Sequence, residues 1–136
     1  MASECIFCRI VKGKIPSYKV YEDKSFVSFL DLKPLTKGNV LVVPKKHSRW
    51  VYDVSNFGEY FELAKVVGLA AKKAFGAEWI SFLTLGLEVP HAHIRVIPRY
   101  KKDLHGPVVD INIHENYSEK ELKDIADSIR RNINKV

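Results

Sequence analysis

The sequence predicts an α+β fold, in which an antiparallel five-stranded sheet packs against one long helix and a C-terminal helix. Two alternating apolar segments flank the polar pair Asp23-Lys24, which is the pattern of a β-hairpin. Over residues 56–75 apolar side chains recur every three or four positions, as on one face of a long amphipathic helix. A capping box, formed by Ser118 and Glu121, begins a second amphipathic stretch near the end of the chain.

The chain of 136 residues is expected to form a single domain over residues 1–136. Its core would cover residues 1–100, and residues 101–136 would be an extension that carries the last helix. A content of 46% hydrophobic and 28% charged residues is typical of soluble globular proteins. No apolar run approaches the roughly 20 residues needed to span a bilayer. The N-terminus lacks the pattern of a signal peptide, so a cytoplasmic protein is expected.

The individual elements follow from their boundary residues. A short helix is expected over residues 9–14, after which Pro16 requires an extended chain. Ser55 is the expected N-cap of the long helix and Gly76 suits its C-cap, while the last helix would end near Asn132. Short apolar runs bounded by turn residues predict strands over residues 18–22, 25–32, 40–44, 79–85 and 89–99, and an edge strand over residues 109–113.

The formal net charge is +6, and many of the cations lie near the histidine-containing segment 89–99. These cations are Lys33, Lys37, Lys45, Lys46, Arg49, Arg95, Arg99, Lys101 and Lys102. Their concentration favours an anionic ligand such as phosphate or nucleic acid, although a solvated lysine-rich surface explains it equally well. His105 and His114 are expected to be surface residues.

The segment Val89–Arg99 is the most informative stretch of the chain. Read as a β-strand, it places His91, His93 and Arg95 on one face, with about 6.6 Å between neighbours in the row. Such a row can bind a metal at one end and an anion at the other. A strand that is simply half-exposed shows the same alternation, so this motif alone does not decide between the two.

A pair of thiols near the N-terminus, Cys5 and Cys8, suits either half of a zinc site or a redox dithiol. With His47 and His91 they make two thiolates and two imidazoles, the donor set of a closed structural zinc site. His93 is then too far along the strand to reach the same ion. A neutral imidazole in that position can attack phosphorus.

Several segments together resemble the histidine triad (HIT) family of nucleotide hydrolases and transferases. The resemblance runs from Cys5 to Arg99 and includes the family signature in the altered form His-x-His-x-Arg. The matching segments are Cys5-Ile6-Phe7-Cys8-Arg9-Ile10, Val20-Tyr21-Glu22-Asp23, Phe29-Leu30-Asp31-Leu32-Lys33-Pro34, residues 38–47 and residues 86–99.

The resemblance implies the fold of the HIT family, a homodimer, and a place in its zinc-binding branch. It implies that His93 is the catalytic nucleophile, with Arg95 beside it on the phosphate. The structural zinc would be held by Cys5, Cys8, His47 and His91. A purine nucleotide, such as AMP or an AMP conjugate, would place its ribose on Asp31. Its other contacts would come from Phe7, Ile10, Phe29, Leu32 and Glu88.

The sequence departs from the family pattern at the site itself. The third histidine is Arg95, and the loop Ser81–Leu87 is short and apolar, with Leu87 where glutamine is usual. The expected function is a nucleotide hydrolase or nucleotidyltransferase that acts on the α-phosphate of purine nucleoside phosphate conjugates through a covalent nucleotidyl-histidine at His93. The alternatives are a nucleotide-binding regulatory module with little or no catalysis, and a zinc-stabilised binder of nucleic acid.

Overall fold

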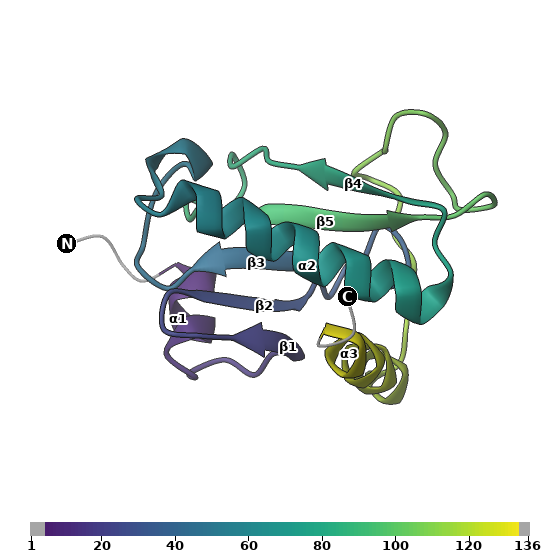
Figure 1. Ribbon diagram of the computed structural model, residues 1–136, viewed down its shortest axis with the longest axis horizontal. Coiled ribbons are helices and arrows are strands. Elements are labelled where there is room, and N and C mark those ends of the chain that lie inside the picture. The colour runs from purple at the N-terminus through teal and green to yellow at the C-terminus, as the bar shows by residue number, and fades with distance from the viewer. Residues whose placement is uncertain (1–4, 134–136) are drawn as a thin grey trace.

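The computed structural model describes residues 5–133, and its centre is a five-stranded antiparallel sheet (Figure 1). The strands lie in the order β1-β2-β3-β5-β4, so that β4 forms one edge and β1 the other. The predicted α+β architecture is therefore confirmed. The elements are α1 (Ile6–Val11), β1 (Lys19–Glu22), β2 (Phe26–Leu30), β3 (Val40–Pro44), the 3₁₀ helix η1 (Val51–Asp53), α2 (Phe57–Phe75), β4 (Trp79–Leu83), β5 (Ile94–Arg99) and α3 (Glu119–Ile133).

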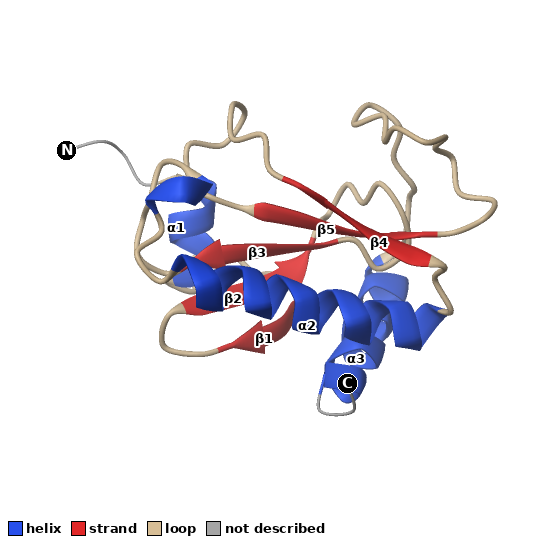
Figure 2. Cartoon of the chain, turned by 45° about the horizontal axis from the view of Figure 1, so that its top comes forward, coloured by secondary structure: helices blue, strands red, loops and turns tan. Residues whose placement is uncertain are grey.

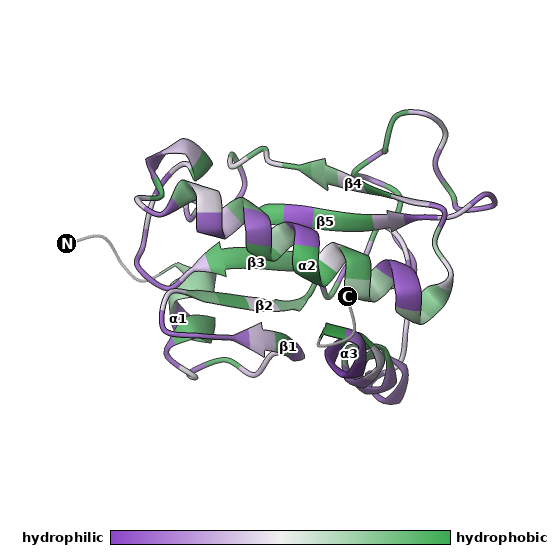
Figure 3. Cartoon of the chain, in the orientation of Figure 1, coloured by the Kyte–Doolittle hydropathy of each residue, from purple (hydrophilic) through white to green (hydrophobic). Residues whose placement is uncertain are grey.

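The long helix α2 crosses one face of the sheet, and α3 packs against α2 and β1 (Figures 1 and 2). Alternate residues of β3 and β5 point into this layer, and Figure 3 shows the hydrophobic character of the central strands. At Gly68 the helix lies close to the sheet, since an added Cβ would lie 3.1 Å from a methyl group of Val96. No helix in the described part of the chain combines the length and apolarity that a membrane span requires.

The opposite face of the sheet carries a smaller apolar cluster under α1. Phe7 and Ile10 of α1 are buried against side chains of β2 and β3, among them Phe29 and Leu41. The helix begins earlier than the predicted range of 9–14, because the Cys5 Sγ caps it by accepting the Cys8 N–H at 3.3 Å. This cap places both cysteines at the start of α1.

The histidine-containing segment is only partly a strand, because β5 begins at Ile94 and not at residue 89. Pro90 has no N–H for a ladder, and the His91 N–H turns back to the Val89 carbonyl at 2.8 Å. The Ala92 N–H then bonds the Ser48 carbonyl at 2.7 Å. Both histidines therefore lie in a bent segment that leads into β5. The strands β1, β2 and β4 are likewise shorter than predicted.

The extension after β5 contains no strand over residues 109–113, so that prediction is wrong. The carbonyl and carboxylate of Asp110 accept the N–H groups of Ile113 and Asn112 at 3.1 and 2.9 Å, which makes a local turn. The predicted capping box is present: the Ser118 N–H reaches the Glu121 carboxylate at 2.9 Å, and the Glu121 N–H reaches the Ser118 hydroxyl at 3.1 Å. The N-cap of α2 is Asn56 and not Ser55.

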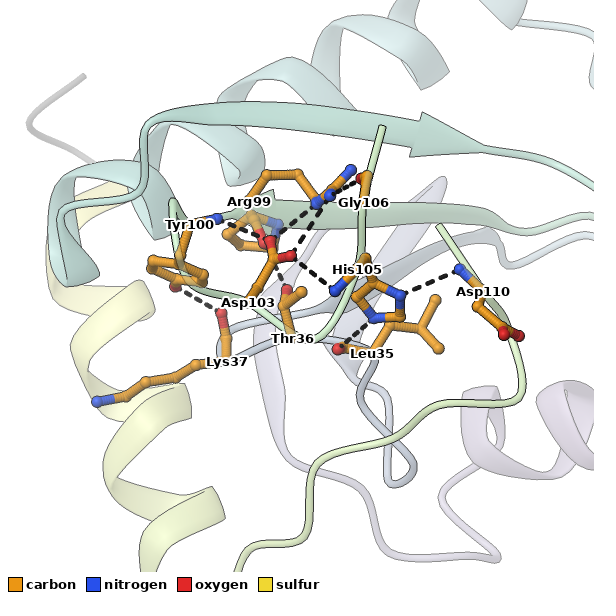
Figure 4. Close-up of polar contacts among 10 residues, drawn as sticks. Leu35, Thr36, Lys37, Arg99, Tyr100, Asp103, His105, Gly106 and Asp110 are labelled. Atoms are coloured by element: carbon orange, nitrogen blue, oxygen red, sulfur yellow. Dashed lines mark hydrogen bonds and ion pairs between the residues drawn. The ribbon is translucent and has the colours of Figure 1, made fainter. Parts of the chain in front are cut away.

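A buried ion pair fixes the start of this extension to the end of β5 (Figure 4). The Arg99 Nε lies 2.9 Å from the Asp103 carboxylate, and the two side chains are 3% and 4% exposed. The same carboxylate accepts the N–H groups of Tyr100 and His105, and Arg99 also donates to the Gly106 carbonyl. His105 in turn donates to the Leu35 carbonyl at 2.9 Å. The His105 side chain, which was predicted to be on the surface, thus helps to hold the extension against the rest of the domain.

We expect Asp103→Asn to lower the free energy of unfolding by about 2 to 4 kcal/mol near pH 7, because it leaves the buried Arg99 without its counterion. Burial raises the pKa of Asp103, but the guanidinium and two backbone N–H groups outweigh this and hold it below the ordinary 3.8. The contribution is therefore complete above pH 3.8 and is lost as the pH falls further. Urea unfolding of both proteins across this range measures the difference.

The matched control is Asp110→Asn, which changes an exposed carboxylate in the same extension. It should change the free energy of unfolding by no more than about 0.5 kcal/mol. Equal stabilities of the Asp103 and Asp110 variants at pH 7 would contradict the role given to the ion pair.

Candidate metal centre and nucleotide site

Four soft or borderline donors converge where α1 meets the end of β3 and the segment before β5. Cys5, Cys8, His47 and His91 each offer one donor atom, and these atoms all lie within 4.8 Å of one another. The Cys5 Sγ is 3.2 Å from the His91 Nδ1, the Cys8 Sγ is 3.2 Å from the His47 Nδ1, and the two Nδ1 atoms are 3.1 Å apart. The edges of a tetrahedral S₂N₂ zinc site measure about 3.3 to 3.8 Å, so these three donor separations are within a few tenths of an ångström of those in a zinc site.

The hydrogen bonding of His91 also fits a metal. Its Nε2 lies 2.8 Å from the Pro44 carbonyl, which can only accept, so the ring proton is on Nε2. The lone pair of Nδ1 consequently points at the His47 ring and the two sulfur atoms. Burial is the largest influence on this imidazole and lowers its pKa to about 4, so that it is neutral near pH 7. A neutral ring with an inward lone pair is the form that binds zinc.

His93 lies on the same side of the sheet but makes different contacts. Its ring is 5.1 Å from the Phe7 ring, which also lies 5.9 Å from the ring of His91. The His93 Nδ1 donates to the His91 carbonyl at 2.8 Å, so its Nε2 carries the lone pair. Burial lowers the pKa of His93 and the Arg95 charge lowers it further, against the opposing effect of the His91 carbonyl. This imidazole is therefore neutral and oriented.

The carboxylate predicted to bind ribose lies just past the end of β2. The Asp31 Oδ1 accepts the Lys33 N–H at 2.9 Å, which holds the side chain in a tight turn. Burial raises the pKa of Asp31, while the Lys33 N–H and the charges of Arg95, His114 and His93 oppose that rise. The carboxyl group of Asp31 therefore interacts electrostatically with both His93 and Arg95.

Of the residues predicted to hold the base, three lie in one apolar cluster and the fourth, Leu32, lies outside it. Phe7 and Phe29 make an edge-to-face pair with centroids 5.7 Å apart, and Ile10 is buried in the same cluster. Leu32 is 62% exposed, and no contact of its side chain with this cluster is seen. The apolar wall of the site therefore consists of α1 and β2, next to His93.

Comparisons with known proteins agree with this geometry. A family model described as the HIT domain matches residues 12–102 of the chain. The protein hit of Bacillus subtilis is 37% identical, over 97% of this chain and 96% of the relative. The chain belongs to the HIT domain family. The cluster of two cysteines and two histidines fits the zinc-binding branch of the HIT proteins.

Two further matches describe what HIT proteins of this kind look like. An adenosine 5′-monophosphoramidase of Schizosaccharomyces pombe is 36% identical, over 70% of this chain and 74% of the relative. The crystal structure of a Hit-like protein involved in cell-cycle regulation from Bartonella henselae superposes with a TM-score of 0.83 and 30% identity, over 96% of this chain and 97% of that one. The HIT fold is thus shared along almost the whole chain, and nucleotide hydrolases are among its relatives.

Arg95 occupies the position of the third histidine in this HIT protein. Its side chain is 14% exposed, and its Nε is buried without a hydrogen-bond partner among the described residues. Its Nη2 lies 3.9 Å from the carboxylate of Glu88, which is largely exposed. This loose pair leaves guanidinium donors available for an anion at the site.

Arg49, one of the cations noted near the signature, holds the loop that precedes it. The Arg49 Nη1 donates to the Gly86 carbonyl at 2.6 Å, and the guanidinium lies 3.8 Å from the centre of the Trp50 ring. Gly86 has a φ of 80° and packs on that ring, where a Cβ would come within 3.1 Å of it. Leu87 remains 80% exposed. Sequence alone gave no signal for this contact, because its partners are 37 residues apart.

Proposed function

We propose that this HIT protein is a nucleotide hydrolase or nucleotidyltransferase, which acts on the α-phosphate of purine nucleoside phosphate conjugates through a covalent nucleotidyl-histidine at His93. The observation that carries the proposal is the His93 Nδ1 bond to the His91 carbonyl, which leaves Nε2 unprotonated beside Arg95. The S. pombe relative, an adenosine 5′-monophosphoramidase, supports the choice of an AMP conjugate.

The nucleotide would bind along the face of the sheet that carries α1. Its base packs on the apolar wall of Phe7 and Phe29, with Ile10 behind them. Its ribose hydroxyls donate to Asp31, which brings the α-phosphate to His93. Leu32 is exposed and lies at the rim of the nucleotide site. Glu88 does not touch the nucleotide in this arrangement and acts on it through its ion pair with Arg95.

The reaction would proceed in two displacements at phosphorus. The His93 Nε2 lone pair forms the P–N bond, and the bond to the leaving group breaks with its electron pair passing to that group. The positive charge on the ring is stabilised by the His91 carbonyl, to which Nδ1–H still donates. Arg95 stabilises the charge on the non-bridging oxygens. Water or another hydroxyl acceptor then forms an O–P bond and releases its proton to solvent, which balances the proton that the leaving group takes from solvent. The P–N bond breaks with its electron pair returning to Nε2, which restores neutral His93.

Cys5, Cys8, His47 and His91 would hold zinc in a structural role. The four protein donors would fill all four coordination positions of the zinc ion, so the ion would cross-link the chain and leave no position for substrate. The link joins α1 to the chain before β5, and therefore sets Phe7 against His93. Neither cysteine is in a disulfide, which suits the reducing cytoplasm where we place the protein.

The direct test of this function is release of AMP from adenosine 5′-monophosphoramidate by the full chain. Turnover is expected, and competition by AMP should slow it. The exposed Leu87 and the Arg95 replacement favour a second candidate, a nucleotide-binding module without catalysis. Binding of AMP with no product from phosphoramidates, adenylated phosphates or dinucleoside polyphosphates would favour that candidate and contradict the enzyme.

We also propose that the protein is a homodimer joined through β4 and α2. Strand β4 is a sheet edge, and such an edge invites pairing with a second chain. The register sets Phe82 opposite Val96, whose side chain faces α2, so Phe82 lies on the α2 side of the sheet. Phe82 is 47% exposed there and Leu69 of α2 is 39% exposed. These apolar side chains flank the edge that a second copy would extend.

Phe82→Lys is expected to convert the dimer to a monomer, because a charge at the centre of a small apolar interface is desolvated without a partner. Sedimentation at several concentrations measures the change. The control is Leu104→Lys, which alters a side chain of similar exposure (55%) in the extension and should leave the dimer intact. A monomeric unmodified protein, or a dimer that survives Phe82→Lys, would refute this interface.

A further inference from the structure

The extension after β5 returns to the candidate nucleotide site at His114. The His114 Nδ1 donates to the Lys33 carbonyl at 3.2 Å, and the Glu115 N–H donates to the Pro34 carbonyl at 2.8 Å. Two consecutive residues of the extension are thus bonded to the turn that follows β2. That turn also contains Asp31, whose Oδ1 accepts the Lys33 N–H at 2.9 Å.

Lys33 therefore connects the two side chains through its own backbone. Its N–H binds the Asp31 carboxylate, and its carbonyl binds the His114 ring. A positive charge on His114 would oppose the burial-induced rise in the pKa of Asp31. His114 is exposed, and because it and Asp31 both bond the backbone of Lys33, the two side chains lie on the same turn.

The hydrogen bonds to Lys33 leave one acceptor atom open on each of these two side chains. Because the Lys33 carbonyl only accepts, the proton of a neutral His114 is on Nδ1 and the lone pair is on Nε2. That Nε2 has no partner among the described residues. The Asp31 Oδ1 is used by the Lys33 N–H, which leaves Oδ2 as the open acceptor. A ribose presents two adjacent hydroxyl donors, one for each acceptor.

We propose that His114 is a specificity-determining residue for the ribose, and that its Nε2 accepts one hydroxyl of the cis-diol while the Asp31 Oδ2 accepts the other. This inference rests on the proposed nucleotide-binding function and adds selection of ribonucleotides over deoxyribonucleotides. The residue lies after the segment 12–102 that matches the HIT domain model.

The test is calorimetric binding of AMP, 2′-deoxy-AMP and 3′-deoxy-AMP to the full chain and its variants. The unmodified protein should bind AMP about 3- to 10-fold more tightly than the analogue that lacks the His114-bound hydroxyl. His114→Ala should weaken AMP binding by a similar factor and abolish discrimination at that hydroxyl. Its affinity for the corresponding deoxy analogue should equal that of the unmodified protein.

Two variants separate recognition from simple displacement of the extension. The His114→Asn amide can still donate to the Lys33 carbonyl but lacks an atom at Nε2, so it should lose discrimination as the alanine variant does. Asn116→Ala, a change of an exposed neighbour, should bind all three nucleotides normally. An equal loss for all three nucleotides in His114→Ala, or no loss, would overturn the assignment and leave the proposed function intact. Failure of the unmodified protein to bind any of them would overturn both.

Discussion

His93→Ala is expected to lower turnover of adenosine 5′-monophosphoramidate by about 10,000-fold or more, since it removes the oriented, unprotonated Nε2 that is proposed to attack the α-phosphorus. The loss should be almost entirely in kcat, because the proposed base and ribose contacts come from Phe7, Phe29 and Asp31. Steady-state kinetics together with AMP binding measure the two effects separately.

His93→Asn is the matched variant for this experiment. Its amide can donate to the His91 carbonyl in place of Nδ1–H, but it has no nucleophilic nitrogen at the position of Nε2. It should be as inactive as the alanine variant while its fold, zinc content and AMP affinity are kept. Activity within tenfold of the unmodified protein in either variant would rule out attack by His93.

Removal of the metal is expected to have the largest effect on stability. Cys8→Ser replaces a thiolate whose sulfur lies 3.2 Å from the His47 Nδ1 and 3.4 Å from the His91 Nδ1. Structural zinc contributes on the order of 10 kcal/mol in small domains. A loss of only a third of that would lower the Tm of a chain of this size by about 10 °C. Zinc analysis and thermal unfolding of both proteins give the comparison.

The control is His114→Ala, which removes an exposed imidazole outside the donor cluster. It should retain about one zinc ion per chain, as one four-donor site provides. Unfolding of the unmodified protein in a strong chelator should reproduce the Tm of Cys8→Ser. A protein purified without zinc, or a Cys8→Ser variant with the same Tm as the unmodified protein, would contradict the proposal that zinc has a structural role.

The elements that the sequence predicted well are those whose signals are local. The hairpin of β1 and β2 follows from the turn at Asp23, whose carboxylate accepts the N–H groups of Ser25 and Phe26 at 2.8 Å. The helix α2 follows from apolar periodicity and ends at Gly76 with a φ of 67°. The capping box likewise begins α3. Each signal lies within a few residues of the feature it predicts.

The failures arise where a distant partner decides the backbone. Residue 89 did not begin β5, because Ala92 bonds the carbonyl of Ser48 on another segment. The extension gave no pattern that links His105 to Leu35 or His114 to Lys33, since these pairs are 70 and 81 residues apart. His105 looked like a surface histidine for that reason but is half-buried, whereas His114 is exposed as predicted and only its bond to Lys33 was unforeseen.

The metal donors were predicted in part: the four residues were identified from the sequence, but the donor nitrogen of each ring was not. Their residue types and the family resemblance identified Cys5, Cys8, His47 and His91, and the structure brings all four together. The choice of ring nitrogen was not predictable, because it depends on the bond of the His91 Nε2 to the Pro44 carbonyl. The same holds for His93, whose free Nε2 follows from a backbone carbonyl two residues earlier.

The central claim is that His93 becomes covalently bonded to the α-phosphorus of a nucleotide. Intact mass spectrometry after brief exposure to a nucleoside phosphoramidate, followed by mapping of the acid-labile adduct, tests it most directly. The account predicts an increase by one nucleotidyl group on a peptide that contains His93, and none in His93→Asn. Rapid release of nucleotide with no adduct at any quench time, or an adduct on another residue, would contradict it.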